Sequence, residues 1–271
     1  MSETVIKIED LSLTYETEKT SYQALKNVDL EINKGEFVCL IGPSGCGKST
    51  LLSALEGILE PSEGRVLING KEVHGAGPER AVVFQNYSLF PWMSARKNVA
   101  FAMIESKRGI KKISKREAYK TADEYLAKVG LSEYKDKQPG ELSGGMQQRV
   151  AIARALACDP EILLMDEPFG AIDAKTREVL QQLLLKLWAE DENKKTIVFV
   201  THDLDEALLL ADRIVFMIPK GIHQVINVDL KRPRDKEKLL IDEKYRSIRS
   251  KLVRLFSNEK DETDFVGGAG I

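Results

Sequence analysis

The sequence contains few cysteines, no long apolar run and no excess of charge of one sign. Its three cysteines, Cys39, Cys46 and Cys158, have neither the spacing of a metal site nor that of a disulfide framework, which is typical of a reducing compartment. The 40 basic and 42 acidic residues leave a net charge of −2, so no overall field attracts nucleic acid or anionic lipid. Every apolar run is far shorter than the roughly 20 residues that span a bilayer. If this chain serves a membrane, another chain crosses it.

The remaining composition is that of a folded protein. With 43% hydrophobic and 30% charged residues, the chain is unlike a disordered sequence. Its 271 residues can bury a substantial core, as one large domain or two small ones. The first residues lack the basic-then-apolar pattern of a secretory signal, and none is expected.

The periodicity of apolar residues predicts strands at both ends of the chain and helices between them. Strands are expected at residues 5–8, 11–15, 28–32, 37–41, 65–68, 81–84, 162–165, 196–200 and 213–218. Helices are expected at residues 94–105, 114–129, 143–157, 174–190, 204–210 and 235–256. The pattern predicts an α/β fold with a mostly parallel sheet and flanking helices. An N-terminal antiparallel β subdomain and a helical subdomain inserted at about residues 90–160 complete it.

A phosphate-binding pattern follows the continuously apolar strand 37–41. Its residues are Gly42, Pro43, Ser44, Gly45, Cys46, Gly47, Lys48, Ser49 and Thr50. They match G-x-x-x-x-G-K-[ST] between a buried strand and a helix, where glycines let backbone N–H groups turn towards phosphate oxygens. The helix N-terminus and Lys48 add positive charge, and Ser49 offers a hydroxyl to Mg²⁺.

Two carboxylates end the apolar strand 162–165. Asp166 lies at its C-terminal edge, where ligands of open α/β sheets are held, and suits the shell of Mg²⁺. Glu167, one residue on, could polarise an attacking water. Such a pair alone is more often a solvated loop start, and the nearby phosphate loop reverses that preference.

A third motif opens the helix expected at residues 143–157. Ser143 is a favourable N-cap, and Gly144 and Gly145 leave the N–H groups of the first turn open to an anion. In isolation, these three residues would be interpreted as an ordinary capped helix that tolerates two glycines.

Together the motifs resemble the ATP-binding-cassette (ABC) ATPases over nearly the whole of residues 1–220. The resemblance implies that residues 42–50 are the Walker A loop and residues 142–147 the signature motif. It implies likewise that residues 162–166 are Walker B and that Glu167 is the catalytic base.

Four further positions take roles from this resemblance. Gln85 corresponds to the Q-loop glutamine, which reaches Mg²⁺ and the attacking water. Asp173 lies in the D-loop, with Ile172 where the family usually has leucine. His202 corresponds to the switch histidine at the γ-phosphate, and Tyr15 to the aromatic that stacks on adenine.

The resemblance implies a P-loop NTPase core that binds ATP and Mg²⁺, the metal held by Ser49, Gln85 and Asp166. Two chains would pack head to tail, each ATP held by one phosphate loop and the partner's signature motif. Residues 1–230 would form the nucleotide-binding domain, 231–257 a C-terminal helical extension and 258–271 a disordered tail.

The family implies integral membrane permease subunits as partners and, indirectly, an extracytoplasmic substrate-binding protein. The chain would then lie peripherally on the cytoplasmic side of the membrane. A soluble ABC ATPase of DNA repair or translation, an exporter or lipoprotein-type ABC ATPase and a P-loop kinase are the alternatives. The first usually carries coiled-coil insertions or two cassettes, and the kinase gives no reason for residues 142–147.

Softer signals resemble the nitrate/sulfonate/taurine/bicarbonate importer branch, namely residues 90–92, 201–213 and 232–235. They indicate no particular cargo. Phe90 and Trp92 are expected either to fill a buried loop or to meet the permease. Residues 107–120 are basic, which predicts a solvated helix and linker or, as a minority view, a surface near lipid headgroups.

Cys46 lies within the phosphate loop, beside Lys48 and a helix N-terminus. Two expectations are open for it. A nearby cation and a helix N-terminus favour a reactive thiolate. Equally, Cys46 could be a small residue whose sulfur turns inward.

Overall fold

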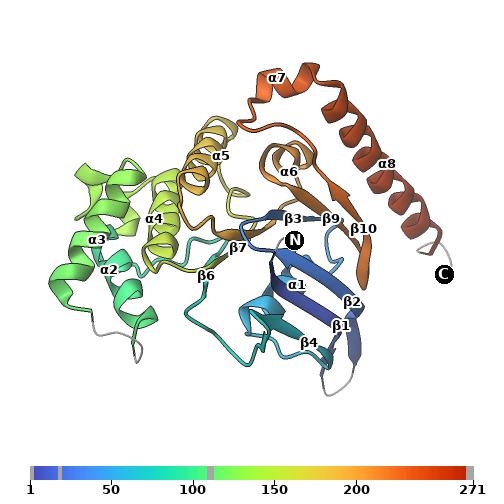
Figure 1. Cartoon of the computed structure of the whole chain (residues 1–271), viewed down its shortest axis with the longest axis horizontal. Helices are drawn as coiled ribbons and strands as arrows, with labels where there is room; N and C mark the ends of the chain where they lie inside the picture. Colours follow the sequence, from blue (N-terminus) through green and yellow to red (C-terminus); the bar gives the residue numbers. More distant parts are fainter. Residues whose placement is uncertain (1–2, 18–19, 109–112, 267–271) are drawn as a thin grey trace.

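The computed structural model describes residues 3–17, 20–108 and 113–266, which form two β-sheets and their flanking helices (Figure 1). The strands are β1 (Thr4–Glu16), β2 (Ser21–Asn33), β3 (Phe37–Ile41), β4 (Glu63–Ile68), β5 (Lys71–Glu72), β6 (Arg80–Val83), β7 (Ile162–Asp166), β8 (Thr196–Val200), β9 (Arg213–Ile218) and β10 (Gly221–Asn227). The helices are α1 (Lys48–Glu56), α2 (Ala95–Ser106), α3 (Lys115–Lys128), α4 (Gly144–Ala157), α5 (Ala174–Ala189), α6 (Leu204–Leu210), α7 (Lys236–Ile241) and α8 (Glu243–Val266), with short 3-10 turns at Ser132–Tyr134 and Pro139–Glu141.

The central sheet has the strand order β10-β9-β3-β8-β7-β6. Strands β9, β3, β8, β7 and β6 are parallel, and β10 pairs antiparallel with β9 at one edge. All residues of β3 and β8 are buried, as expected for strands covered on both faces. The predicted α/β class with a mostly parallel sheet is therefore confirmed.

The N-terminal strands form a second, antiparallel sheet with the order β2-β1-β4-β5. The two strands predicted at residues 5–8 and 11–15 are one strand, β1. Its register shifts between Ile8 and Leu11, because Asp10 adopts a left-handed backbone with φ 48° and bulges the strand. This sheet packs with α1 against one face of the central sheet (Figure 1).

Helices α2 and α3 pack with one side of α4 around an apolar core of their own, left of the sheets in Figure 1. The other side of α4 packs on the central sheet, on the face opposite α1. Each of the three helices starts at a serine whose side chain accepts a backbone N–H, as the sequence predicted for Ser143.

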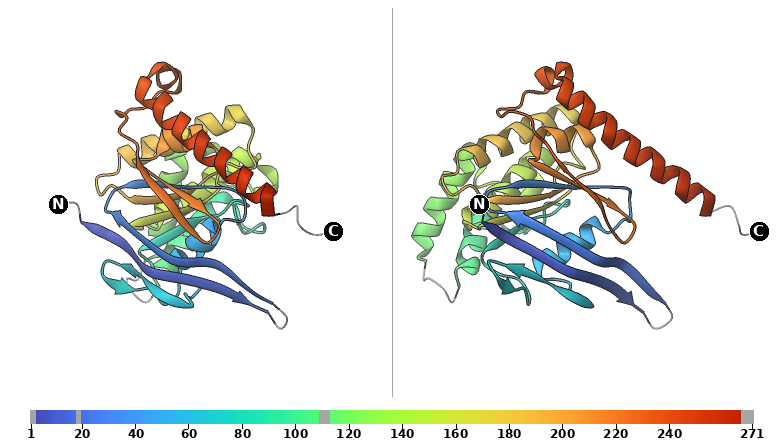
Figure 2. Two further views of the ribbon diagram at one scale, coloured as in Figure 1. Left: turned by 90° about the vertical axis from the view of Figure 1, so that its right-hand side faces the viewer. Right: turned by 45° about the vertical axis from the view of Figure 1, so that its right-hand side comes forward.

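The C-terminal residues form an arm, residues 231–266, that lies over α6 and β9 (Figure 2). The single helical region predicted at 235–256 is two helices, because Asp242 ends α7 and then caps α8 by accepting the N–H of Tyr245. Helix α8 extends to Val266, whereas the sequence predicts a tail from residue 258; residues 243–266 contain neither proline nor glycine, so nothing in them interrupts a helix. Residues 267–271 lie outside the described residues. Strand β10 was not predicted.

Candidate nucleotide-binding site

The phosphate loop, residues 42–47, joins the carboxyl end of β3 to α1 and depends on glycine at two points. A Cβ on Gly42 would collide with the carbonyl oxygen of Met217 on the neighbouring strand β9. Gly47 has φ 106°, and a Cβ there would lie 2.8 Å from Leu25. The loop therefore passes closer to its neighbours than any side chain permits.

Helix α1 begins without a side-chain cap, its N-cap being Gly47. Each of the helices α2 to α7 begins at a serine or aspartate whose side chain accepts a backbone N–H. The first N–H groups of α1 are thus left for another acceptor at the positive end of the helix. An anion such as phosphate supplies that acceptor.

Lys48 extends from the first turn of α1 back across the loop. Its ammonium donates to the carbonyl oxygens of Gly42 and Pro43, both at 2.8 Å, and it lies 3.8 Å from the sulfur of Cys46. The side chain is 7% exposed. The positive charge is therefore held inside the loop that the sequence predicts to hold phosphate.

Asp166 ends β7 opposite the start of α1. The Ser49 hydroxyl donates to its Oδ1 at 3.2 Å. Burial raises the pKa of Asp166 above its usual range, and the neighbouring charge of Glu167 raises it further, whereas the Ser49 hydrogen bond lowers it. A cation beside Asp166 would favour the ionised carboxylate.

Two hard oxygen donors, the Ser49 hydroxyl and the Asp166 carboxylate, therefore lie together, as Mg²⁺ requires. Among the described residues, no group of three or more His, Cys, Asp and Glu side chains is arranged to hold a metal by itself. That arrangement suits Mg²⁺, which commonly takes one or two protein ligands and completes its shell with phosphate and water.

Glu167 and His202 meet at the ends of β7 and β8. The Oε2 of Glu167 lies 3.2 Å from the Nδ1 of His202, whose side chain is 62% exposed. Gln85 extends to the same place, since its Nε2 and the Glu167 Oε2 both lie within about 3.5 Å of the position a Cβ would take on Gly170. Glu167 itself adopts φ 41°, a left-handed conformation that is strained for glutamate.

Tyr15 lies near the end of β1, beside the phosphate loop helix. Its hydroxyl is 3.2 Å from the Oγ1 of Thr50, and its ring is exposed. The structure thus brings together six of the predicted regions: Tyr15, the phosphate loop, Gln85, Asp166, Glu167 and His202.

The signature residues Ser143, Gly144 and Gly145 belong to the other face of the sheet. The Ser143 hydroxyl accepts the N–H of Met146, so Ser143 caps α4. A Cβ on Gly144 would lie 3.1 Å from the Tyr87 hydroxyl, and one on Gly145 would collide with Thr176. Because α1 and α4 pack on opposite faces of β3, the two glycine-rich helix starts are separated within one chain.

Asp173 in the predicted D-loop caps α5, with its side chain accepting the N–H of Thr176 at 3.0 Å. Hydrogen bonding with the Thr176 side chain, and then with this backbone N–H, lowers the pKa of the Asp173 carboxyl. Ile172, where the family usually has leucine, is buried in the core.

The position of Cys46 distinguishes between the two expectations for it, a reactive thiolate and an inward-turned sulfur. Its side chain is fully buried, and a Cβ on Gly42 would lie 2.9 Å from its sulfur. The geometry favours the inward-turned thiol over an exposed thiolate. The other two cysteines, Cys39 and Cys158, are also buried, and burial raises the pKa of both thiols.

The sequence did not predict the residues that support this site through hydrogen bonds to its neighbouring loops. Arg154 on α4 donates to the backbone carbonyls of Tyr87 and Ser88, two left-handed residues just after Gln85. Glu206 accepts hydrogen bonds from Thr201 and from Gln181, which lies on α5. The weak signal for them was a polar residue within an apolar helical pattern.

An apolar groove of about 670 Å³ lies between α1, β6 and α2, lined by Ile58, Phe84, Phe90, Phe101 and Cys158 among others. Phe90 packs edge-on against Phe101 with ring centroids 5.2 Å apart. The ring centroids of Trp92 and Phe90 are 5.6 Å apart, and Trp92 is 69% exposed. These aromatic residues therefore form a surface, and only part of Phe90 is buried.

Within residues 3–17, 20–108 and 113–266, no helix combines the length and the apolar character needed to cross a bilayer. The conserved-family model described as ABC transporter matches residues 25–170. The bicarbonate transport ATP-binding protein CmpD of Synechococcus elongatus is 47% identical over 90% of this chain and 87% of that protein. The nitrate import ATP-binding protein NrtD of the same species is 46% identical over 92% and 91% of the two chains.

Among solved structures, the chain resembles a dimeric, post-hydrolysis ATP-binding cassette, MJ0796, bound to ADP and phosphate. The match has a TM-score of 0.73 and 37% identity, and it covers 83% of this chain and all of the other. Since the family model covers more than half of the chain and relatives match about nine-tenths of it, the chain belongs to the ABC transporter ATP-binding proteins, the ATPases of that transport family.

Proposed function

We propose that this chain is the subunit that binds and hydrolyses ATP to drive solute import through a separate permease. The uncapped start of α1, with Lys48 folded into the loop in front of it, is the observation that carries this proposal. It supplies several N–H donors and one cation to the same anion. Glu167 and His202 lie beside it for hydrolysis.

Each predicted site residue then has a role that its position supports. The backbone N–H groups of the loop residues Gly42, Ser44, Gly45, Cys46, Gly47, Lys48, Ser49 and Thr50 would face the phosphates, and Pro43, which has no N–H, would help to fix the path of the loop around them. Lys48 exchanges its two carbonyl acceptors for phosphate oxygens, and Tyr15 supports adenine. Ser49, Asp166 and Gln85 would hold Mg²⁺, which neutralises phosphate charge. Glu167 polarises the attacking water, and His202 steadies the γ-phosphate next to it.

A second copy of this chain completes each site in this proposal. The phosphate loop lies with α1 on one face of the central sheet, and the helix that Ser143, Gly144 and Gly145 open lies on the other. One nucleotide therefore meets the phosphate loop of one chain and the signature residues of its partner, with Asp173 at the junction. The dimeric state of the similar cassette MJ0796 supports this arrangement.

Complementation in heterodimers tests the composite sites. Lys48→Ala chains paired with Ser143→Arg chains carry one intact site and one doubly damaged site. The matched control pairs a Lys48→Ala, Ser143→Arg chain with the parent chain, which places one mutation in each site. We expect purified, doubly tagged heterodimers of the first kind to hydrolyse ATP and those of the control not to. Equal activity of the two pairings would contradict a site formed between chains.

The permease is proposed to dock in the apolar groove beside Phe90 and Trp92. Exposed aromatic anchors beside an apolar groove suit a helix of another protein. The chain would then lie on the cytoplasmic side of the membrane, as a peripheral subunit. An extracytoplasmic binding protein would deliver the cargo, and the names of the similar proteins CmpD and NrtD favour a small anion such as bicarbonate or nitrate.

Replacing Phe90 and Trp92 by serine tests the docking surface. We expect the variant to bind ATP as the parent does and to lose co-purification with the permease. Tyr134→Ser provides a control, because Tyr134 is an exposed aromatic residue outside the groove. A double variant that stays attached to the permease would exclude this surface.

A further inference from the structure

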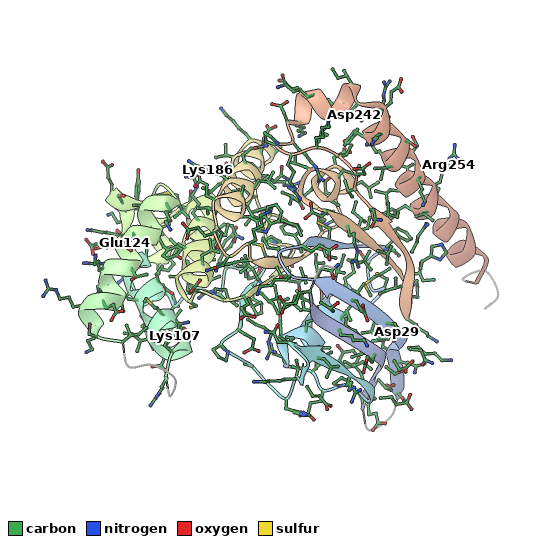
Figure 3. The ribbon with its side chains drawn as sticks, in the orientation of Figure 1. Asp29, Lys107, Glu124, Lys186, Asp242 and Arg254 are labelled. Atoms are coloured by element: carbon green, nitrogen blue, oxygen red, sulfur yellow. The ribbon has the colours of Figure 1, made fainter. Side chains whose placement is uncertain are left out.

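The short helix α6 begins two residues after His202, and the C-terminal arm holds it at both ends. Such a helix has only two turns and few bonds of its own, so its position depends on what surrounds it. The arm belongs to a distant part of the sequence, residues 231–266. Asp242 and Arg254, labelled in Figure 3, mark the start of α8 and its outward face.

The first turn of α6 is held by α8 through Asp205. The Tyr245 hydroxyl donates to its Oδ1 at 2.7 Å, and the Arg249 Nε donates to the same oxygen at 2.6 Å. Tyr245 is 3% exposed, and burial followed by the hydrogen bond to Asp205 raises its pKa, so the phenol remains a donor. Both contacts fix one oxygen, three residues after His202.

The last turn of α6 is held by the beginning of the arm. Arg234 is buried and donates to the carbonyls of Leu208, Leu209 and Ala211, which are left unpaired at a helix end. Arg232 donates to the carbonyl of Leu210. Burial lowers the pKa of Arg234 to about 10, so it remains charged at neutral pH.

Buried contacts connect α6 to the residue before His202. Glu206 on α6 accepts from the Thr201 hydroxyl at 2.5 Å and from the Gln181 amide at 2.7 Å. The Thr201 hydroxyl also accepts the N–H of Asp203. Residues 201–206 are therefore one hydrogen-bonded unit, and a shift of α6 moves His202 relative to Glu167, which directly follows the neighbouring strand β7.

We infer that Tyr245 and Arg249 are positioning residues for ATP hydrolysis: by fixing Asp205, they hold α6 so that His202 stays against Glu167. Neither residue touches the nucleotide site. The inference rests on the proposed function, because it gives these residues a part in the same reaction. It also gives the C-terminal arm a role in catalysis from outside the cassette core.

The test uses the full-length chain carrying Tyr245→Phe and Arg249→Met. These replacements keep the buried ring and the alkyl stem and remove only the two donors to Asp205. Lys244→Met is the matched control, because Lys244 lies on the same helix and pairs with exposed Asp229 rather than with α6. Arg249→Lys, made alone in the parent chain, keeps a cationic donor at position 249.

Two measurements are made on each protein. Steady-state ATPase assays give kcat and KM for ATP separately. Proton–nitrogen spectra of histidine-labelled protein report the imidazole of His202 directly, since the chain has only two other histidines. The spectra need neither nucleotide nor activity, so they test the positioning even where hydrolysis is not observed.

We expect the double variant to lose about tenfold in kcat, with KM for ATP changed less than twofold, because the nucleotide contacts are intact. The His202 signals should shift, while those of His74 and His223 stay. Lys244→Met should match the parent, and Arg249→Lys should lie close to it.

A double variant with parental kcat and unmoved His202 signals would overturn the inference. So would a rise in KM equal to the fall in kcat with unmoved His202 signals. If the parent chain itself lacks ATPase activity while the His202 signals respond to the double variant, the proposed function fails and the positioning contact stands.

Discussion

In both the nucleotide site and the C-terminal arm, a cationic side chain donates to backbone carbonyls. The two regions differ in whether a ligand can replace those carbonyls. Arg234 in the arm is 4% exposed, and its guanidinium donates to the backbone carbonyls of Leu208 and Ala211 at the end of α6. Lys48 in the site uses its ammonium on two carbonyls that phosphate can replace. The α1 N-terminus has no side-chain cap, and His202 is 62% exposed. Polar groups paired inside the core serve stability, whereas groups that are exposed, uncapped or bonded to replaceable partners are available to a ligand.

Glu167→Gln should give the largest effect and separate the two regions most clearly. The amide keeps the shape and removes the base, so kcat should fall by a factor of roughly 10² or more. Nucleotide binding and the free energy of unfolding should stay close to the parental values. Single-turnover hydrolysis and nucleotide titration measure the two separately.

The matched change is Glu178→Gln, on the exposed surface of α5, which should leave kcat unaltered. Turnover by Glu167→Gln within a factor of two of the parent would remove Glu167 from the mechanism.

Arg234→Met should lower the free energy of unfolding and leave the nucleotide site intact, which is the reverse of the Glu167→Gln result. Carbonyls of Leu208, Leu209 and Ala211 would lose their donor inside the core, which costs on the order of 3 kcal/mol of unfolding free energy. Denaturant unfolding of the full chain measures this loss. The comparison predicts that the nucleotide affinity of the folded fraction changes little.

Arg254→Met provides the control for that loss, since Arg254 is exposed on α8. If both variants unfolded at the same denaturant concentration, the carbonyl cluster at the end of α6 would not need Arg234.

Glu56, the last residue of α1, is a buried carboxyl that is neither part of the nucleotide site nor part of the C-terminal arm. Burial, and then the charge of Asp166, raise its pKa to about 7. Because the folded state holds this proton more tightly than the unfolded chain, its contribution to stability is complete below pH 4.5 and is lost as the pH rises through 7. Glu56→Gln removes that dependence.

The unfolding free energy of the Glu56→Gln variant, relative to the parent, should therefore increase by about 2 kcal/mol between pH 5 and pH 8. Urea unfolding at the two pH values measures it, and Glu60→Gln on the exposed surface is the control. A difference that is independent of pH would show that the carboxyl is ionised in the folded protein throughout.

Cys46→Ala should have the smallest effect. The loop binds phosphate through N–H groups and Lys48, and the buried sulfur takes no part in that binding. We expect kcat within about twofold of the parent. In the native chain, mass spectrometry should find maleimide labelling of Cys46 no faster than that of Cys39, which is equally buried. Faster labelling of Cys46 would restore the exposed-thiolate expectation.

The sequence predicted the nucleotide side well because its chemistry is local. Nine consecutive residues place the phosphate loop, and the apolar runs 37–41 and 196–200 coincide with β3 and β8. The contact of Tyr245 and Arg249 with Asp205 could not be predicted in this way. Tyr245 and Arg249 lie 40 and 44 positions after Asp205, and the sequence does not distinguish them from the many other polar residues that could bind it.

Local backbone geometry accounts for the other differences. Asp10 merges two expected strands into one bulged strand, because a left-handed residue shifts register without ending the pairing. Asp242 splits one expected helix into two through a capping bond that periodicity does not report. The order of strands in the central sheet likewise depends on long-range pairing, which a pattern of apolar residues leaves undetermined.

The left-handed backbone at Glu167 sets stability and activity against each other. A glutamate at φ 41° carries strain of about 1 kcal/mol that glycine or asparagine would release. Selection for heat resistance alone would therefore favour loss of this carboxylate. Thermostabilised variants should be sequenced at this codon before their activity is interpreted, because a gain in melting temperature there would mark an inactive transporter subunit.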